Sequence, residues 1–324
     1  MAAPKRRPRV DWTGKKIVRL RSGPRYEQLH EVARKAQNWS IEKLSILDYY
    51  LGYDPEHGPG GGFLKAAQRA PQRFYVDGYS GPGHVRAGKG GPLLEGSPLI
   101  ALEAAVGAGR DARGTSDDGR IRFTKCLFVE SHARAERALR LALANYESTR
   151  WRLWRGDFNA LAPDVFGQVN PLAPVFAFLD LEDLDDLDFA TIRSIANLPN
   201  RRRKVELLIT LPVGRLLPRA AHLPSLQSML ARTTGAADDV AALFAPYQEP
   251  AAIEWDKVSP ALVELFTRQL EAAGYLYVQV CGLPRTNPIF HLVFATDHPV
   301  GAEIMKDAFD PETRRRREVQ IRLI

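Results

Sequence analysis

Acidic residues stand at the predicted ends of three β-strands, and a glycine-rich turn follows the first of them. Asp77 opens the segment Asp77-Gly78-Tyr79-Ser80-Gly81-Pro82-Gly83, Glu130 closes the second strand, and Asp157 follows the third. Glycine lets a backbone approach a ligand with no Cβ in the way. A carboxylate can accept hydrogen bonds from ribose hydroxyls or from an exocyclic amine. Together these residues predict a nucleoside-shaped pocket whose floor is formed by Gly78, Gly81 and Gly83.

Phe158, which follows Asp157, is a candidate to pack on a purine face of the same ligand. Each of these residues also has a purely structural explanation, which the sequence leaves open. The glycine segment can be a tight turn without a ligand, and Glu130 a strand-end residue that faces solvent. Asp157 can cap the next helix.

The glycine turn does not match the dinucleotide fingerprint. That motif needs a third glycine three residues after Gly83, where this chain has Arg86. Its acidic ribose partner is expected about twenty residues on, whereas Glu130 lies much farther along the chain. These departures disfavour a hydride-transfer enzyme.

Seven short apolar segments predict the strands that position these residues: 74–80, 126–131, 151–158, 175–182, 205–212, 275–283 and 289–297. The first five are separated by stretches long enough for helices, which favours a parallel sheet covered on both faces. The last two are joined by a short connection and form an antiparallel pair. The expected fold class is α/β: a Rossmann-like sheet of seven strands with an antiparallel C-terminal hairpin and helices on both faces. A ligand should lie outside the carboxyl ends of the first strands.

Local signals set the expected helix boundaries. The stretch 26–51 is expected to be helical, with Ser40 as a cap. Ser97 is expected to cap a helix that has Pro98 at its first position. A helical insertion at about 222–272 ends in a helix that starts at Ser259-Pro260 and stops at Gly274. Residues 107–122 are expected to form a surface loop.

The positive charge of the chain is concentrated at its start. The net charge is +7, yet residues 1–25 hold nine Lys and Arg against one Asp, so the other 299 residues sum to −1. A basic arm over 1–25 indicates an acidic partner, with nucleic acid as the first expectation and a solvated tail as the alternative. The expected organisation is this arm, an α/β domain over 26–310, and a basic tail over 311–324.

Composition excludes several classes of protein. Hydrophobic residues make up 45% of the 324 residues, which is ordinary for a globular chain. No apolar run is long enough to span a bilayer and no signal peptide is visible, so a cytoplasmic location without membrane contact is expected. Cys126 and Cys281 are expected to be buried, inert thiols, and the seven histidines show no metal-ligand spacing.

The motifs resemble those of the three-Cys-motif partner (TcmP) proteins, a family with a class I S-adenosylmethionine-dependent methyltransferase-like fold. The resemblance covers roughly residues 25–310. Its matching segments are 43–47, 75–83, 96–99, 128–130, 156–159, 178–180, 207–212 and 291–299. The glycine turn with Gly96-Ser97-Pro98 is also similar to bacterial ribosomal-RNA adenine-N6 methyltransferases.

The resemblance implies a seven-stranded methyltransferase sheet and S-adenosylmethionine as the ligand of Asp77, Glu130 and Asp157. It also implies a partner protein bearing three cysteines. The leading hypothesis is therefore a methyltransferase acting on nucleic acid. The alternative is a catalytically degenerate fold that serves as a binding or scaffold protein.

The match departs from related amino-methylating enzymes at the fourth strand end. Those enzymes have an Asp or Asn followed by two prolines and an aromatic, whereas this chain has Asp180-Leu181-Glu182-Asp183. Asp180 is the candidate catalytic residue, and the missing aromatic speaks against stacking on an extruded base. The acidic run over 182–188 is expected to be a solvated loop, with a divalent-ion site as the lesser alternative. Candidate substrate contacts are Lys43, Arg215 and Arg219.

Overall fold

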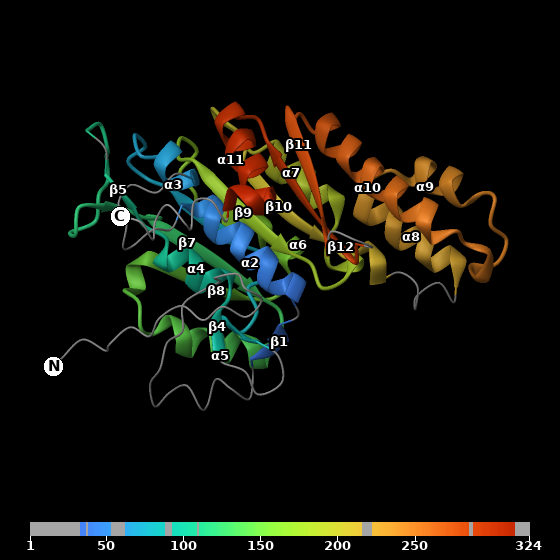
Figure 1. The fold of residues 1–324 in the computed structure, drawn as a ribbon, viewed down its shortest axis with the longest axis horizontal. Coiled ribbons are helices and arrows are strands. Elements are labelled where there is room, and N and C mark those ends of the chain that lie inside the picture. Colours follow the sequence, from blue (N-terminus) through green and yellow to red (C-terminus); the bar gives the residue numbers. More distant parts are fainter. Residues whose placement is uncertain are drawn as a thin grey trace. The chain divides into compact units, whose positions relative to one another are not determined.

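The computed structural model describes residues 33–36, 38–52, 62–87, 93–108, 110–215, 222–284 and 288–314 (Figure 1). The chain forms two compact units, one from residues 1–157 with 303–324 and the other from residues 158–302. The predicted basic arm over 1–25 lies outside the described residues, as does the predicted tail beyond residue 314.

Three parallel strands form the first unit's share of the main sheet. β2 (Phe74–Asp77) pairs with β7 (Lys125–Glu130), which pairs with β8 (Trp151–Arg155). All of β2 and the last five residues of β7 are buried, as is typical of parallel strands covered on both faces. Helix α4 (Ser97–Glu103) contacts β2 and β7, and α5 (Ala133–Leu143) contacts β7 and β8.

The second unit contributes four strands. β9 (Val175–Asp180) runs parallel to β10 (Glu206–Leu211), while β12 (Phe290–Thr296) is antiparallel to both β10 and β11 (Tyr277–Leu283). Between β10 and β11 lie three helices that contact one another, drawn in orange in Figure 1: α8 (Leu223–Thr234), α9 (Ala237–Phe244) and α10 (Trp255–Ala272). The unit also contains α6 (Phe158–Phe166) and α7 (Phe189–Ala196).

The strands of the main sheet follow the order β11-β12-β10-β9-β2-β7-β8. Helices alternate with the first five strands along the chain, and the last two strands form the antiparallel hairpin. The expected fold class is therefore confirmed: an α/β, Rossmann-like sheet of seven strands of the methyltransferase type.

Smaller elements complete the described chain. A three-stranded sheet has the order β1 (Arg34–Ala36), β3 (His84–Ala87) and β4 (Leu93–Glu95), and β5 (Val106–Gly107) pairs with β6 (Arg120–Ile121). The remaining helices are α2 (Asn38–Leu51), α3 (Gly62–Ala66) and α11 (Pro299–Phe309). Short 3-10 turns are η1 (Ser148–Arg150), η2 (Leu184–Asp186), η3 (Val213–Arg215) and η5 (Pro250–Ala252).

The expected helix over 26–51 needs correction. Residues 34–36 form β1, because their backbone pairs in parallel with β3, and the helix begins at Asn38, two residues before Ser40. Its apolar stripe is nevertheless as expected, since Ile41, Leu44, Leu47 and Leu51 are all at most 4% exposed. Residues 26–32 lie outside the described part of the chain.

The predicted starts of two further helices were wrong. Helix α10 begins at Trp255 and carries Pro260 inside it, because burial of Val258 (0% exposed) holds the turn that precedes the proline. Helix α4 has Gly96 at its N-cap and no side-chain cap hydrogen bond, so Ser97 is the first helical residue and not the cap.

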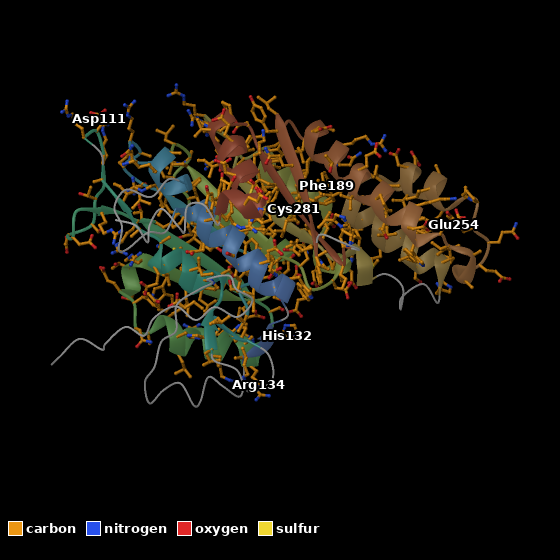
Figure 2. All side chains as sticks on the ribbon, viewed as in Figure 1. Asp111, His132, Arg134, Phe189, Glu254 and Cys281 are labelled. Atoms are coloured by element: carbon orange, nitrogen blue, oxygen red, sulfur yellow. The ribbon has the colours of Figure 1, made fainter. Side chains whose placement is uncertain are left out.

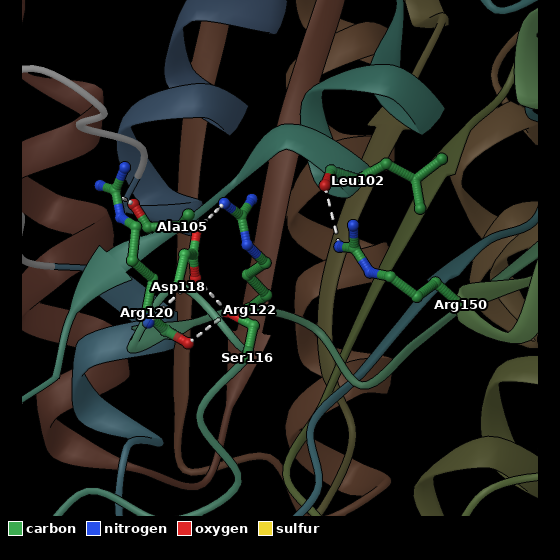
Figure 3. Close-up of polar contacts among 7 residues, drawn as sticks. All are labelled: Leu102, Ala105, Ser116, Asp118, Arg120, Arg122 and Arg150. Atoms are coloured by element: carbon green, nitrogen blue, oxygen red, sulfur yellow. Dashed lines mark hydrogen bonds and ion pairs between the residues drawn. The ribbon is translucent and has the colours of Figure 1, made fainter. Parts of the chain in front are cut away.

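Most described residues of the expected surface loop over 107–122 are exposed, and residues 116–122 form a hydrogen-bonded turn (Figure 3). The Asp118 carboxylate accepts hydrogen bonds from Ser116 Oγ (2.6 Å), Arg120 N (3.1 Å) and Arg122 Nη2 (2.7 Å). These contacts, with Ser116 first and Arg122 next, hold the pKa of Asp118 well below its usual range. Arg120 Nη2 also donates to the carbonyl of Ala105 at 3.2 Å, which ties the turn to the end of α4.

A fully buried arginine anchors this turn to the start of β2. Arg73 is 0% exposed, and its guanidinium donates only to backbone carbonyls among the contacts of the described residues. The acceptors are those of Ala70 (2.5 Å), Arg113 (3.0 Å), Gly114 (2.6 Å) and Arg122 (3.0 Å). One fully buried side chain thus ties together four backbone carbonyls from three segments of the first unit.

We expect Arg73→Met to lower the free energy of unfolding by about 3 kcal/mol or more, because a fully buried side chain loses its four hydrogen bonds to backbone carbonyls. Urea denaturation followed by circular dichroism measures the change. The control is Arg69→Met, whose side chain is 78% exposed and pairs with Asp111, and which should cost about 1 kcal/mol or less. Equal losses in the two variants would contradict the anchoring role.

Candidate functional site

The carboxylate of Asp77 lies inside the first unit at the end of β2. The residue is 0% exposed, and its carboxylate accepts hydrogen bonds from Tyr75 Oη at 3.2 Å and from Tyr79 N at 3.3 Å. The Asp77 carbonyl accepts from Ser80 Oγ at 3.1 Å. A buried carboxylate needs such donors, so Asp77 fixes the turn that follows it.

Two glycines in this turn have different local reasons. Gly81 has φ +62°, and no atom lies within 4 Å of the place where a Cβ would sit, so the turn borders open space there. Gly83 has φ +80°, and an added Cβ would meet Leu139 of α5 at 3.0 Å. The carbonyl of Gly83 accepts from Gly96 N at 2.8 Å. Gly83 therefore serves packing, whereas Gly81 leaves a space beside the turn. Gly78, the third predicted floor residue, is buried.

Glu130, at the end of β7, has one carboxylate oxygen held by the backbone. The residue is 5% exposed, and its Oε1 accepts from His132 N at 2.7 Å, with His132 Nδ1 at 3.4 Å. Among the described residues no hydrogen bond reaches Oε2. Since Oε1 is held by the backbone, the side chain is oriented in advance and Oε2 is left as an acceptor.

Backbone hydrogen bonds join the three strand ends. Ser80 N donates to the carbonyl of Val129 at 2.9 Å, and Gly156 N donates to that of Glu130 at 3.1 Å. In register, Asp77 pairs with Phe128, and Glu130 two residues further on pairs with Arg155. At about 3.3 Å per strand residue, Glu130 stands roughly 7 Å beyond the level of Asp77. Asp77 and Glu130 therefore lie at successive levels along the strand direction, a spacing that suits an elongated ligand.

The third acid and its neighbour differ in exposure. Asp157, two residues beyond Arg155, is exposed at the rim of the first unit. Phe158 is the first residue of α6 in the second unit and is 1% exposed. Its ring is therefore buried in this structure. Stacking on a purine, which needs an exposed ring face, stays a prediction.

The structure describes one of the three candidate substrate side chains, that of Lys43. Lys43 lies in α2 and is 7% exposed. Arg215 ends η3, and its side chain is outside the described part of the structure. Arg219 also falls outside the described residues. Their substrate contacts stay predictions.

Asp180 ends β9 in the second unit and is partly exposed. In the acidic run after it, carboxylates accept hydrogen bonds from backbone N–H groups of the same run. Asp186 Oδ2 accepts from Glu182 N and Asp183 N, and Asp183 Oδ1 accepts from Leu184 N. Asp188 caps α7. Leu181, at the position of the expected proline, is 1% exposed. This run is therefore a hydrogen-bonded turn rather than a loosely solvated loop.

Metal-ligand and thiol chemistry find no support in the described part of the chain. No group of three or more His, Cys, Asp or Glu side chains able to hold a metal ion occurs among the described residues. Cys126 and Cys281 are buried as expected, at 0% and 3% exposure. Burial raises the pKa of the Cys126 thiol to about 12, which keeps it protonated and unreactive near neutral pH.

Sequence reasoning missed two residues that shape this edge. The first is Tyr75, whose hydroxyl contacts Asp77, and the second is Ser80, whose backbone N–H binds β7. The signal for Tyr75 was available: residues two apart on a strand point to the same face. No sequence pattern announces the backbone contact of Ser80.

Comparison with known proteins adds structures of low similarity. Trm1 from Pyrococcus horikoshii, solved with S-adenosyl-L-methionine, is 10% identical over 84% of this chain and 58% of its own length, with a TM-score of 0.37. TYW2 from M. jannaschii, solved with AdoMet, is 10% identical over 81% of this chain and 76% of its own, with a TM-score of 0.35. A putative caffeoyl-CoA O-methyltransferase from Staphylococcus aureus is 9% identical over 70% and 77%, with a TM-score of 0.34.

At such values the likeness carries no argument about activity, and the fold class rests on the strand order itself. No family model and no curated protein matches the chain, so the resemblance to the three-Cys-motif partner proteins stays a prediction. Across the part of the chain that the structure describes, every helix is too short or too polar to cross a membrane.

Tyr75 gives a pH-dependent test of the turn. Burial, then the nearby Asp77 charge, raises its pKa well above the ordinary 10. A raised folded-state pKa stabilises the fold fully below about pH 10, and this contribution declines as pH rises towards the folded-state value. We expect Tyr75→Phe to cost about 1 kcal/mol at pH 7, through the lost hydrogen bond. Above pH 10 the free energy of unfolding of Tyr75→Phe should fall less steeply with pH than that of the wild type. The difference in slope is one proton, or about 1.4 kcal/mol per pH unit.

Urea unfolding of the wild type and Tyr75→Phe between pH 7 and 11 measures both effects. Parallel stability curves above pH 10 would show that the Tyr75 hydroxyl does not titrate differently in the folded state.

Proposed function

We propose that this protein is an S-adenosylmethionine-dependent methyltransferase that acts on nucleic acid. The observation that carries the proposal is the edge formed by β2, β7 and β8. There an anchored glycine turn borders open space, and a pre-oriented glutamate has one carboxylate oxygen left to accept. Direct backbone hydrogen bonds hold the turn to the end of β7, and that end to β8.

The residues at this edge fit the chemistry of the cofactor. Glu130 Oε2 would accept from a ribose hydroxyl, and the space beside Gly81 would receive the part of the ligand next to it. Asp157, exposed at the rim, would accept from the adenine amine. Asp77 is a positioning residue in this scheme, because its carboxylate is already used by Tyr75 and Tyr79.

S-adenosylmethionine, when bound, supplies an electrophilic methyl group on a sulfonium. The chain's own contribution is to bind and orient, so that the target nucleophile faces that methyl group. Asp180 is proposed to orient the nucleophile or accept its proton. It belongs to the second unit and enters the proposal from the family resemblance alone.

The choice of nucleic acid rests on charge. The nine basic residues over 1–25, on a body that is otherwise near neutral, favour a polyanionic partner. The family resemblance adds a three-cysteine protein as a working partner.

One observation favours the alternative of a degenerate fold that binds without catalysis. After Asp180, residues 181–186 expose no aromatic side chain that could stack on a base, and two of their carboxylates accept from backbone N–H groups. In that case the edge of the first unit would still hold the cofactor while no methyl group is transferred.

We expect Glu130→Gln to weaken S-adenosylmethionine binding by about 10-fold to 100-fold, since a charge-assisted hydrogen bond contributes about 1.5–3 kcal/mol. Isothermal titration calorimetry measures the dissociation constant. Glu303→Gln, an exposed change in α11, is the matched control and should bind like the wild type. No binding by the folded wild type at millimolar ligand would refute the cofactor assignment.

Asp180→Ala separates the two functions. If the protein is an enzyme, kcat for methyl transfer to nucleic acid, measured with radiolabelled cofactor and the partner present, should fall at least 100-fold. Affinity for the cofactor should be unchanged. Asp164→Ala, an exposed change in α6, should leave kcat unchanged. Cofactor binding without any transfer by the wild type would establish the degenerate alternative.

A further inference from the structure

Five exposed arginines lie on two adjacent elements of the first unit. Arg134, Arg137 and Arg140 belong to α5, and Arg152 and Arg155 belong to β8. Helix α5 contacts β8, an edge strand whose Arg152 and Arg155 point to opposite faces of the sheet. We call the five residues around this edge the α5–β8 arginine surface. We propose that this surface binds the phosphodiester backbone of the nucleic-acid substrate; the inference rests on the proposed function for the chemistry that follows binding.

The arginines of α5 are placed by its amphipathic pattern. Its buried face consists of Ala135, Glu136, Ala138, Leu139, Ala142 and Leu143. The arginines recur every three residues on the other face, and Figure 2 shows Arg134 pointing outward at the start of the helix. At about 1.5 Å per residue they span roughly 9 Å along the helix, enough to reach successive phosphates.

The stability of the helix does not explain Arg134 or Arg137. Arg134 stands in the first turn, where a positive charge is unfavourable by about 0.3–1 kcal/mol against the helix dipole, and Arg137 lies beyond that turn. Arg140 pairs with Glu136, with Nε to Oε1 at 2.9 Å. Among the described residues, Arg137 and Arg155 make no hydrogen bond or ion pair. Two exposed guanidinium groups therefore remain available to phosphates, which arginine binds in a bidentate manner.

β8 adds an aromatic to the basic surface. It is an edge strand of the main sheet with the sequence Trp151-Arg152-Leu153-Trp154-Arg155. The guanidinium of Arg152 lies over the ring of Trp154, with Cζ 4.7 Å from the ring centroid. This cation–π contact orients an exposed charge beside a partly exposed indole. Arg152 and Trp154 lie on the same face of the strand, so a phosphate and a base of one nucleic-acid strand can be contacted together there.

The arginine surface adjoins the edge assigned to the cofactor. Arg155 pairs in register with Glu130, and α5 begins three residues after Glu130. Asp157 follows Arg155 by two residues. A polyanion bound along α5 and β8 would therefore end beside Glu130, within the same unit.

The test compares two triple variants of the full chain. Arg134→Gln/Arg137→Gln/Arg155→Gln removes three charges from the surface. Arg202→Gln/Arg203→Gln/Arg268→Gln removes the same charge from the second unit and is the control. Fluorescence anisotropy measures binding of a labelled 20-nucleotide RNA, the DNA of the same sequence and its duplex over a range of salt concentrations. Thermal melting checks that each variant is folded.

We expect the surface variant to bind at least 10-fold more weakly than the control, and the slope of log Kd against log salt to fall by about 2, since each lost phosphate contact removes about 0.7–0.9. Which probe binds most tightly distinguishes RNA from DNA. Equal affinities of the two variants, or no binding of any probe by the wild type, would overturn the proposal. Calorimetry with S-adenosylmethionine on the same samples distinguishes the two proposals. If the wild type does not bind the cofactor but binds nucleic acid through these arginines, the enzyme proposal is refuted and the arginine surface is retained.

Discussion

A buried carboxylate governs the edge of the first unit. Asp77 has no access to solvent, so its negative charge must be met by donors inside the protein. Tyr79 N is one of those donors, and it can reach the carboxylate only when the chain turns immediately after β2. The turn then places Ser80 N against β7. The position of the glycines relative to Glu130 therefore follows from the need to satisfy one charge.

The glycines of this turn differ in their surroundings. Gly83 is needed because α5 and Gly96 approach its backbone, whereas no atom lies within 4 Å of a Cβ placed at Gly81. A glycine-rich segment is thus not a uniform cradle. The part that packs holds the part that can receive a ligand, so substitutions at the two glycines should be interpreted differently.

The sequence predicted what periodicity and strand-end chemistry can encode. Continuous apolar segments located the strands of the main sheet, and the short connection identified its antiparallel hairpin. It failed where tertiary contacts decide. Residues 34–36 become a strand only because β3 lies beside them, and α10 begins at Trp255, five residues before Pro260, with Val258 buried between them. The burial of Phe158 likewise depends on packing that no local pattern reveals.

Acidic residues near strand ends have two distinct uses here, and hydrogen bonding distinguishes them. In the turn after β9, the carboxylates of Asp183 and Asp186 accept from backbone N–H groups and thereby close that turn. At Glu130 a single N–H holds one oxygen and the other is left to accept. Residue type alone cannot separate these cases, since both are carboxylates after a buried strand. The binding role proposed for Glu130 rests on the one carboxylate oxygen to which no hydrogen bond is made among the described residues.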